Sequence, residues 1–587
     1  MLSKIQEIQQ MIMKKFNNKN DMQSDIISEE IFKLPIAYID EKHQIQENIK
    51  TDLELLPTDD HNSLYNYILN PSDNYANKII PMWGQYYSTS QSFLKDTQYL
   101  LKNFKHIPQP EIVDINNVTT IIDEISNETG FHEKYKYIDI KFLESLNNSS
   151  FFLQGLTLYN LTSPIISLAI PILMFIIPFF ILKIQNIPIS LQTYISTLLT
   201  VFKNHIVGKT LTEFTNVGWD RKVFLIISVV FYFINIYQNI ISCHTFYKNI
   251  YKIRNYLLTI NKFIKYTINS INNLNQYCKK SYSKFTTINN SIKDKLVSFS
   301  NEITVIKLEI ISIKQITKIG EILREFYQLF KNKTYKTALI YSLYLHGYIQ
   351  NITNLQNNIT QKNINYCKFT KKDTSFTDAY FASLINENPV KNTYKLDKHL
   401  LITGPNAAGK TTLLKTTLFN IILSQQFGVG LYKSANINPY TYIHSYINIP
   451  DTSGRDSLFQ AEARRCKEIL DCISTSTASE RHFCIFDEIY SGTNPSEAIA
   501  SAYSFLKYIS HKNIDYILTT HYFSLCRMMK KVYRISNHQM EIKNYKNTYK
   551  LITGISNIKG GIKVLEELEY NKDIIKSAKK IVNKINI

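Results

Sequence analysis

The sequence predicts an α/β domain at the C-terminus, preceded by a mainly α-helical region that contains two hydrophobic helices. Three observations support this prediction. From Phe369 onward, short apolar runs typical of buried strands alternate with helical stretches, which is the pattern of a parallel sheet covered by helices. Residues 246–360 instead carry apolar side chains in steps of three and four, as packed helices do. Residues 164–182 and 223–243 are long apolar runs without a charge.

The chain has 587 residues, which suggests three or four units at ~100–200 residues per domain. We expect an N-terminal domain of unassigned role over 1–150, a hydrophobic hairpin over 151–245, a helical core or lever over 246–369, and the α/β domain over 370–587. Residues 1–150 are polar, with little periodicity, and they indicate no chemistry.

The net charge is +19, from 67 Lys and Arg against 48 Asp and Glu. A basic balance suits phosphate-rich partners, either nucleic acid or an anionic membrane surface. The alternative, given equal weight, is that lysine is simply frequent here and is spread over solvated faces, because the longest basic clusters have two residues.

The seven cysteines form no C-x-x-C pair. This pattern predicts a reducing, intracellular compartment and argues against both a zinc site and a disulfide framework. Met1 to Asn20 lacks a long apolar segment, so we expect no secretory signal there.

The two apolar runs are each long enough to cross a membrane. Pro164–Leu182 holds nineteen residues and Val223–Cys243 holds twenty-one, and a helix needs ~20 to span the hydrocarbon core. The three prolines of the first run would break a soluble helix but are tolerated in a membrane helix. We favour a membrane hairpin, and the alternative is a pair of buried core helices.

Residues 246–360 are expected to form long helices. One apolar stripe follows the helical period and comprises Ile253, Leu257, Ile260, Ile264, Ile271 and Leu274. The simplest interpretation is a helix-packing seam. A lever that embraces DNA is the alternative, and periodicity does not choose between them.

The pattern G-x-x-x-x-G-K-T over Gly404–Thr411 predicts a phosphate-binding loop. It follows an apolar strand, Leu400–Thr403, and precedes a helix, which is the context this P-loop motif requires. Loop N–H groups attract phosphate, Lys410 neutralises its oxygens, and the Thr411 hydroxyl is a ligand for Mg²⁺. We therefore predict an α/β P-loop NTPase domain. Its candidate nucleotide-binding residues are Gly404, Pro405, Asn406, Ala407, Ala408, Gly409, Lys410, Thr411 and Thr412.

An acidic strand lies 77 residues beyond Lys410 and ends in Asp487 and Glu488. Asp487 is expected to hold the Mg²⁺ shell with Thr411, and Glu488 to orient or deprotonate the attacking water. The next apolar strand ends in His521, which can donate to the γ-phosphate or to the water. Glu488 and His521 are therefore the candidate catalytic residues.

Together these motifs resemble, in order and spacing, the ATPase domain of the MutS DNA mismatch-repair family. The resemblance covers about residues 370–587, and its motifs are Thr403–Thr412, Ser457–Glu462, Asp487–Thr493, Thr520–Phe523 and Tyr549–Val564. A final helix over 573–586 follows, as in that family. Asn392 belongs to a short upstream segment that is similar to the place where the family's chain meets the nucleotide.

The resemblance implies a Mg²⁺-dependent ATPase that couples ATP binding and hydrolysis to DNA binding, in mismatch repair or related DNA processing. It implies a homodimer, or a heterodimer with a related chain, that is joined through C-terminal helices. In such a dimer Ser453, Ser457 and Glu462 of one subunit close the nucleotide site of the other. The location is then intracellular: cytoplasm or nucleus, or associated with a membrane.

The chain also departs from the family pattern. Ala407 replaces a Met and Thr411 replaces a Ser, and both changes are compatible with the chemistry of nucleotide binding. Ser491 replaces an Arg that is common in the family, so the sequence leaves open whether ATP hydrolysis is coupled to DNA. The mismatch-binding domain is not recognisable. Phe131-His132-Glu133 resembles the family's aromatic-x-Glu wedge, but we favour a chance match, because the triplet is only three residues in a long chain.

Three other functions were weighed. The first is a membrane-anchored ATPase of this lineage with a partner other than a mismatch. A transporter is disfavoured because no L-S-G-G-Q motif precedes the acidic strand. A chromosome clamp is excluded because 77 residues leave no room for a long coiled coil.

Overall fold

The computed structural model describes residues 31–58, 62–111, 113–127, 130–205, 208–210, 214, 218–305, 318–361, 363–447, 449, 458–543, 546–556, 565 and 568–584. The chain forms two compact units. Unit 1 comprises residues 1–107, 270–291 and 341–587, and unit 2 comprises 108–269 and 292–340. The long helices α11 (Trp219–Tyr277), α12 (Ser283–Val305) and α15 (Lys333–Thr360) contribute residues to both.

Unit 1 contains the α/β part of the chain. Its helices are η1 (Pro35–Tyr38), α2 (Glu47–Asp52), α3 (Asn66–Leu69), α4 (Asn74–Trp83), α5 (Gln91–Asn103), η3 (Lys280–Tyr282), η4 (Ala382–Leu384), α16 (Lys410–Phe427), α17 (Leu458–Thr475), α18 (Pro495–Ile509), α19 (Phe523–Met529) and α21 (Lys572–Lys584). Its strands are β1 (Lys42–Gln44), β2 (Tyr86–Ser88), β3 (Asn365–Phe369), β4 (Ser375–Ala379), β5 (Asn392–Lys395), β6 (His399–Thr403), β7 (Val429–Gly430), β8 (Ser434–Ile437), β9 (Tyr442–Tyr446), β10 (His482–Asp487), β11 (Ile514–Thr520), β12 (Ile535–Lys543) and β13 (Lys546–Thr553).

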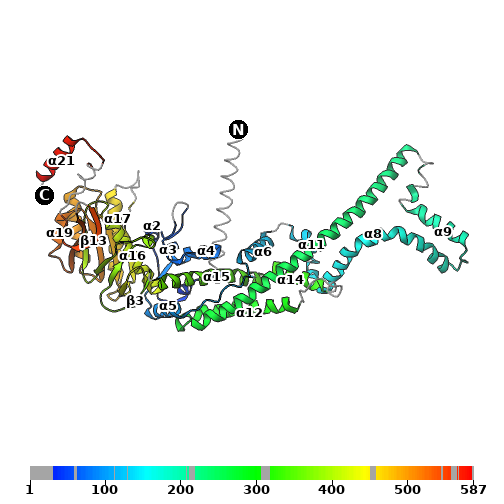
Figure 1. Ribbon diagram of the computed structural model, residues 1–587, viewed down its shortest axis with the longest axis horizontal. Coiled ribbons are helices and arrows are strands. Elements are labelled where there is room, and N and C mark those ends of the chain that lie inside the picture. Colours follow the sequence, from blue (N-terminus) through cyan, green and yellow to red (C-terminus); the bar gives the residue numbers. More distant parts are fainter. Residues whose placement is uncertain are drawn as a thin grey trace. The chain divides into compact units, whose positions relative to one another are not determined.

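A six-stranded sheet organises the C-terminal part, in the order β13-β12-β6-β11-β10-β9. The five strands from β9 to β12 are parallel, and β13 is antiparallel to β12. Every residue of β6 and β11 is buried, as expected of parallel strands covered on both faces. Figure 1 shows this sheet, whose strands run from yellow-green to orange-red, beside α16, α17 and α19. The expected α/β domain is therefore confirmed, and β6, β10 and β11 are the strands that the motifs predicted.

The N-terminal part of unit 1 packs against the C-terminal end of α16. Gln426 Nε2 donates to the carbonyls of Trp83 at 2.6 Å and Tyr86 at 2.8 Å, and Gln425 Nε2 donates to Ser88 O at 3.1 Å. Both glutamines are buried, so these bonds satisfy amides that would otherwise be costly to bury.

The boundaries between the two units lie near residues 107, 269, 291 and 340. They differ from the domain boundaries that the sequence led us to expect at 150, 245 and 369.

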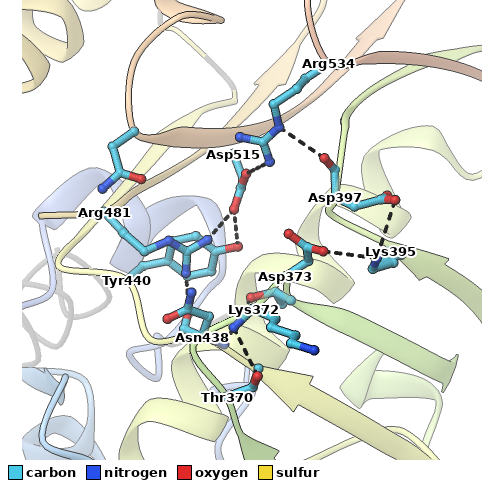
Figure 2. Close-up of polar contacts among 12 residues, drawn as sticks. Thr370, Lys372, Asp373, Lys395, Asp397, Asn438, Tyr440, Arg481, Asp515 and Arg534 are labelled. Atoms are coloured by element: carbon cyan, nitrogen blue, oxygen red, sulfur yellow. Dashed lines mark hydrogen bonds and ion pairs between the residues drawn. The ribbon is translucent and has the colours of Figure 1, made fainter. Parts of the chain in front are cut away.

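A buried ion-pair network ties the amino ends of several strands together (Figure 2). Asp515, on β11, is 3% exposed. Its carboxylate accepts from Arg481 Nη2 at 2.6 Å, Arg534 Nη2 at 2.9 Å and the Tyr440 hydroxyl at 2.9 Å. Arg534 also donates to the backbone of Asp397 at 3.1 Å. The buried charge of Asp515 is therefore compensated by two guanidinium groups.

Unit 2 is helical. It contains α6 (Ile115–Asn127), α7 (Phe131–Tyr135), η2 (Glu144–Asn148), α8 (Ser150–Ile184), α9 (Leu191–Asn204) and α14 (Ile319–Lys331). Phe131 is 2% exposed and stacks on Phe330, with ring centroids 3.9 Å apart. A side chain held in this core cannot probe a base, so the wedge interpretation of Phe131-His132-Glu133 is wrong.

The apolar stripe of α11 is buried along its length. Ile253, Leu257, Ile260, Ile264, Ile271 and Leu274 are each 0–1% exposed. The predicted helix-packing seam is therefore confirmed.

The first part of α11 has the opposite character. Of the described residues, α11 alone forms a helix long and apolar enough to cross a membrane, by length and composition, and only 6% of its most apolar 18-residue window is buried. The other expected span lies in α8, where the described apolar stretch is the shorter Phe175–Ile184. Asn239 of α11 donates to Ser167 Oγ of α8 at 3.0 Å, and Figure 1 shows both helices with α9. A two-span hairpin is thus not confirmed.

Candidate nucleotide-binding site

The phosphate-binding loop connects β6 to α16 at the carboxyl end of the parallel sheet. Gly409 has a φ of 90°, in the left-handed region that favours glycine. A Cβ on Gly409 would also come within 3.0 Å of the Tyr549 ring. Ala407 has a φ of 58°, and Asn547 Nδ2 donates to its carbonyl at 3.1 Å. The backbone of the loop is therefore held in a strained shape, as is common where it cradles a ligand.

Lys410 lies at the centre of the site. Its ammonium donates to the carbonyls of Gly404 at 3.0 Å and Pro405 at 3.2 Å. Burial lowers the pKa of Lys410, and the carboxylates of Glu488 and Asp487 oppose this shift. A buried ammonium that is bonded to the carbonyls of its own loop can exchange these partners for phosphate oxygens.

Asp487 connects the acidic strand to the loop. Its Oδ2 accepts from Thr411 Oγ1 at 2.6 Å, and its Oδ1 accepts from the Thr519 hydroxyl. Carboxylate and hydroxyl oxygens are ligands that suit Mg²⁺, which keeps several of its waters. Thr411 and Asp487, predicted as metal ligands, therefore lie together and fit such an ion. Thr519 was not predicted, because a threonine within a strand carries no motif.

Glu488 and His521 form a pair beside Lys410. His521 Nε2 lies 2.6 Å from Glu488 Oε1, and the same oxygen lies 3.7 Å from Lys410 Nζ. The hydrogen bond from His521 lowers the pKa of Glu488, burial opposes this, and Lys410 adds to the lowering. The two candidate catalytic residues are thus in contact, and Glu488 is held as a carboxylate, the form that can accept a proton.

A cavity of about 390 Å³ opens beside the loop. Its polar lining is the loop from Asn406 to Thr412, together with Glu488. Its aromatic and aliphatic lining comprises Tyr380, Phe381, Leu384, Val390 and Tyr549. A cavity that combines a phosphate-binding loop with aromatic and aliphatic side chains suits a nucleotide, and the volume is in the range of ligand pockets.

Asn392 lines this cavity, but both ends of its amide are bonded to β13. Nδ2 donates to Tyr549 O at 3.0 Å, and Oδ1 accepts from Leu551 N at 2.8 Å. Asn392 therefore positions the strand that carries Tyr549. The aromatic residues Tyr380, Phe381 and Tyr549 were not singled out from the sequence, because they come from segments that only the fold brings together.

Glu462 lies on the first turns of α17 and is buried. Its Oε1 accepts from Ser491 N at 3.0 Å and Ser491 Oγ at 2.9 Å, and its Oε2 accepts from Gly492 N at 3.1 Å. The carboxylate thereby holds the loop after the acidic strand within its own chain. Ser491, which departs from the family pattern, supplies two of these bonds. Ser453 and Ser457 lie outside the described residues. The same is true of residues 557–564, the second half of the Tyr549–Val564 motif, and of residues 1–20.

The parallel sheet, the glycine loop at its carboxyl edge and the adjoining acidic strand define a domain of the P-loop class. Comparison with known proteins agrees: residues 400–586 match the family model of MutS domain V. The C-terminal part of the chain is therefore similar to MutS domain V.

The similar proteins match over the same region. The chain is 32% identical over 183 residues to the "Endonuclease MutS2" of Caldicellulosiruptor saccharolyticus, which covers 31% of this chain and 23% of that protein. It is 29% identical over 186 residues to the protein of the same name from Finegoldia magna. It is 30% identical over 213 residues to the "DNA mismatch repair protein MutS" of Bacteroides fragilis, which covers 34% of this chain and 24% of that protein. The chain thus spans about a quarter of the length of these relatives.

Proposed function

We propose that the protein is a Mg²⁺-dependent ATPase of MutS type that couples ATP binding and hydrolysis to DNA processing. The observation that carries this proposal is the convergence of Lys410, Glu488 and His521, the first two of which line the cavity beside the phosphate-binding loop. Hydrolysis of a phosphoanhydride requires a cationic side chain that binds phosphate, a carboxylate that acts as a base, and a group that holds this carboxylate in place by a hydrogen bond.

Each residue has a distinct role in this reaction. The loop N–H groups and Lys410 bind the phosphates, while Tyr380 and Tyr549 contact the base. Thr411 and Asp487 hold Mg²⁺, which supplies charge neutralisation on the phosphate oxygens when it is bound. Glu488 orients the attacking water and takes its proton, and His521 fixes the position of the Glu488 carboxylate.

Two observations support DNA as the partner. The net charge of +19 favours a polyanion, and the similar proteins are named for mismatch repair or as endonucleases. We propose an intracellular homodimer, or a heterodimer with a related chain, with α21 among its contacts. The apolar side chains Ile574 and Ile581 of α21 are half exposed and suit a helix-to-helix contact.

The test is the ATPase rate of the full-length protein with and without DNA. We expect Mg²⁺-dependent turnover that changes when duplex, mismatched or branched DNA is added, with one DNA structure giving the largest change. Turnover that is the same with every DNA, together with no DNA binding at low salt, would rule out the DNA-processing part while leaving the ATPase intact.

A membrane-anchored ATPase that acts on a partner other than a mismatch is the second candidate. It is favoured by one observation: only 6% of the apolar window of α11 is buried. Side chains such as Phe224, Phe231 and Tyr237 are each at least 65% exposed. Exposing them to water is unfavourable, and a lipid environment would remove that cost.

A further inference from the structure

A cluster of three potential metal ligands lies in unit 1, away from the nucleotide-binding site. His482 is the first residue of β10, whereas Asp487 is its last. His444 lies on the neighbouring strand β9, and Cys472 lies on α17. The ligand atoms of these three side chains all lie within 4.8 Å of one another. Within the described part of the chain, no other group of at least three His, Cys, Asp or Glu side chains meets this condition.

The distances suit a tetrahedral metal ion. His444 Nε2 lies 3.1 Å from His482 Nδ1, and two nitrogens bound at 2.0–2.1 Å to tetrahedral zinc lie about 3.3 Å apart. Both histidines are buried, and Cys472 is partly exposed. The thiol can therefore move by the small amount that closes the site, and it gives an ion a route from solvent.

The hydrogen bonds around His482 place a lone pair in the cluster. The Ser476 hydroxyl donates to Ile473 O at 2.8 Å, so its oxygen accepts from His482 Nε2 at 2.8 Å. With the proton of His482 on Nε2, its Nδ1 accepts a hydrogen bond from His444 Nε2, so the lone pair of Nδ1 points into the cluster. Metal-binding histidines are typically oriented in this way, by a hydrogen bond from the other ring nitrogen.

We propose that His444, Cys472 and His482 form a zinc-binding site. Two imidazoles and a thiolate are a ligand set that Zn²⁺ favours, and the fourth tetrahedral position is left for water. On binding, the Cys472 thiol loses its proton to solvent, and the Nε2 proton of His444 moves to Nδ1. The sequence argued against zinc because the cysteines form no C-x-x-C pair. These three ligands are 28 and 10 positions apart, and only the fold brings them together.

Such an ion would link the second half of α17 to the edge of the six-stranded sheet. β9 is the last strand of that sheet, and its Ser445 is bonded to Asp52 and Asn48 of the N-terminal segment. Zinc would thus add a cross-link to a strand that has a sheet neighbour on one side only. The effect is on stability, independent of the proposed ATPase function.

The test uses the full-length protein, stripped with a chelator and titrated with Co²⁺ as a spectroscopic substitute for Zn²⁺. We expect a thiolate-to-cobalt charge-transfer band and tetrahedral d–d bands that saturate at one equivalent per chain and disappear when Zn²⁺ is added. Zn²⁺ alone should raise the thermal midpoint by roughly 2–3 °C at a hundredfold excess over Kd. The Mg²⁺ ligands are oxygens, so Co²⁺ bound there gives no charge-transfer band.

The Cys472→Ser variant should lose both the band and the thermal shift, whereas the control Cys243→Ser, at another partly exposed cysteine, should keep them. His482→Gln should lose the tetrahedral d–d bands. A wild-type protein without a charge-transfer band, or a band that survives in Cys472→Ser, would overturn the assignment. Because Cys472 is partly exposed, its serine variant is expected to fold, and a far-ultraviolet spectrum like that of the wild type would establish this.

Discussion

Glu488 Oε1 lies 2.6 Å from His521 Nε2, at the tips of two neighbouring parallel strands. The register pairs Asp487 with Thr519, so the residues that follow each of these are brought to the same edge. The imidazole thus holds the carboxylate beside Lys410, where a terminal phosphate would lie. This pairing makes separate predictions for binding and for hydrolysis.

Hydrolysis should depend on Glu488 more than nucleotide binding does. Glu488→Gln keeps the size and hydrogen-bonding capacity of the side chain but removes the base, so turnover should fall by ~10²-fold or more while ATP binding is retained. Lys410→Ala should instead weaken ATP binding by at least about 10-fold, because it removes a charged hydrogen-bond donor. Steady-state turnover and equilibrium ATP binding distinguish the two effects.

A matched control for Glu488 is Glu497→Gln, which changes an exposed acid on α18 bonded to Thr493 at 2.9 Å. It should leave turnover close to that of the wild type. Turnover near the wild-type rate in Glu488→Gln would show that another group activates the water.

The acid limb of the pH–rate profile should move when His521 is removed. The His521 hydrogen bond lowers the pKa of Glu488, so the active carboxylate persists to lower pH and activity is lost as the pH falls through that pKa. In His521→Ala the largest contribution to this lowering is lost, while burial still raises the pKa of Glu488, so the limb should shift to higher pH. Turnover measured between about pH 4 and 8 tests this, and an unshifted limb would mean that His521 does not act through Glu488.

The proposed composite sites can be tested by mixing two inactive chains. In a head-to-tail dimer of Lys410→Ala with Ser457→Ala, one site carries both defects and the other carries neither. Mixing should therefore restore part of the activity. If mixed dimers form and no activity returns, each site is built within one chain, as the bonds of Glu462 to Ser491 and Gly492 already are.

Asp515 should be the most sensitive of the acids in Figure 2. Asp515→Ala leaves the guanidinium groups of Arg481 and Arg534 without their shared carboxylate, and breaking a buried pair in this way costs about 3–5 kcal/mol. Asp373→Ala is the control, because its ion pair with Lys395 is about half exposed and water screens such surface pairs, so that they contribute little to stability. Urea unfolding of both variants measures the difference, and equal losses would contradict the importance of the network.

Membrane anchoring predicts retention in the pellet after an alkaline carbonate wash of cell membranes. The exposed apolar window of α11 is the reason, and deletion of residues 160–245 should release the protein. Recovery of the full-length chain in the washed supernatant would exclude an integral anchor and favour the DNA-processing function. Retention would favour the second candidate.

The loop, the acidic strand and His521 could be predicted from sequence because each motif is contiguous, and because chemistry restricts the residues that can occupy it. The order of the strands in the sheet could not be predicted from sequence, because it depends on which apolar segments pair with each other. The lining of the cavity could not be predicted either, because it comes from distant segments. Tyr380 and Tyr549 are 169 positions apart, and no local pattern connects them.

The wedge interpretation of Phe131 fails for a related reason. A triplet specifies residue types but not exposure, and the burial of Phe131 is decided by Phe326 and Phe330, almost two hundred positions later. Similarly, the family resemblance implied that Glu462 closes the nucleotide site of a partner subunit. Its bonding to the backbone of its own chain became visible only when the loop around Ser491 was in place.

The glutamines at the end of α16 have a consequence for synthesis of the chain. Gln426 and Trp83, which share a hydrogen bond, are 343 residues apart, and chains are made at about 5–20 residues per second. The strand and helices around Trp83 thus leave the ribosome roughly 17–70 seconds before their partner does. During that interval their unpaired backbone carbonyls and apolar faces are open to incorrect partners. Expression of this protein should therefore depend on chaperones that bind the nascent N-terminal segment.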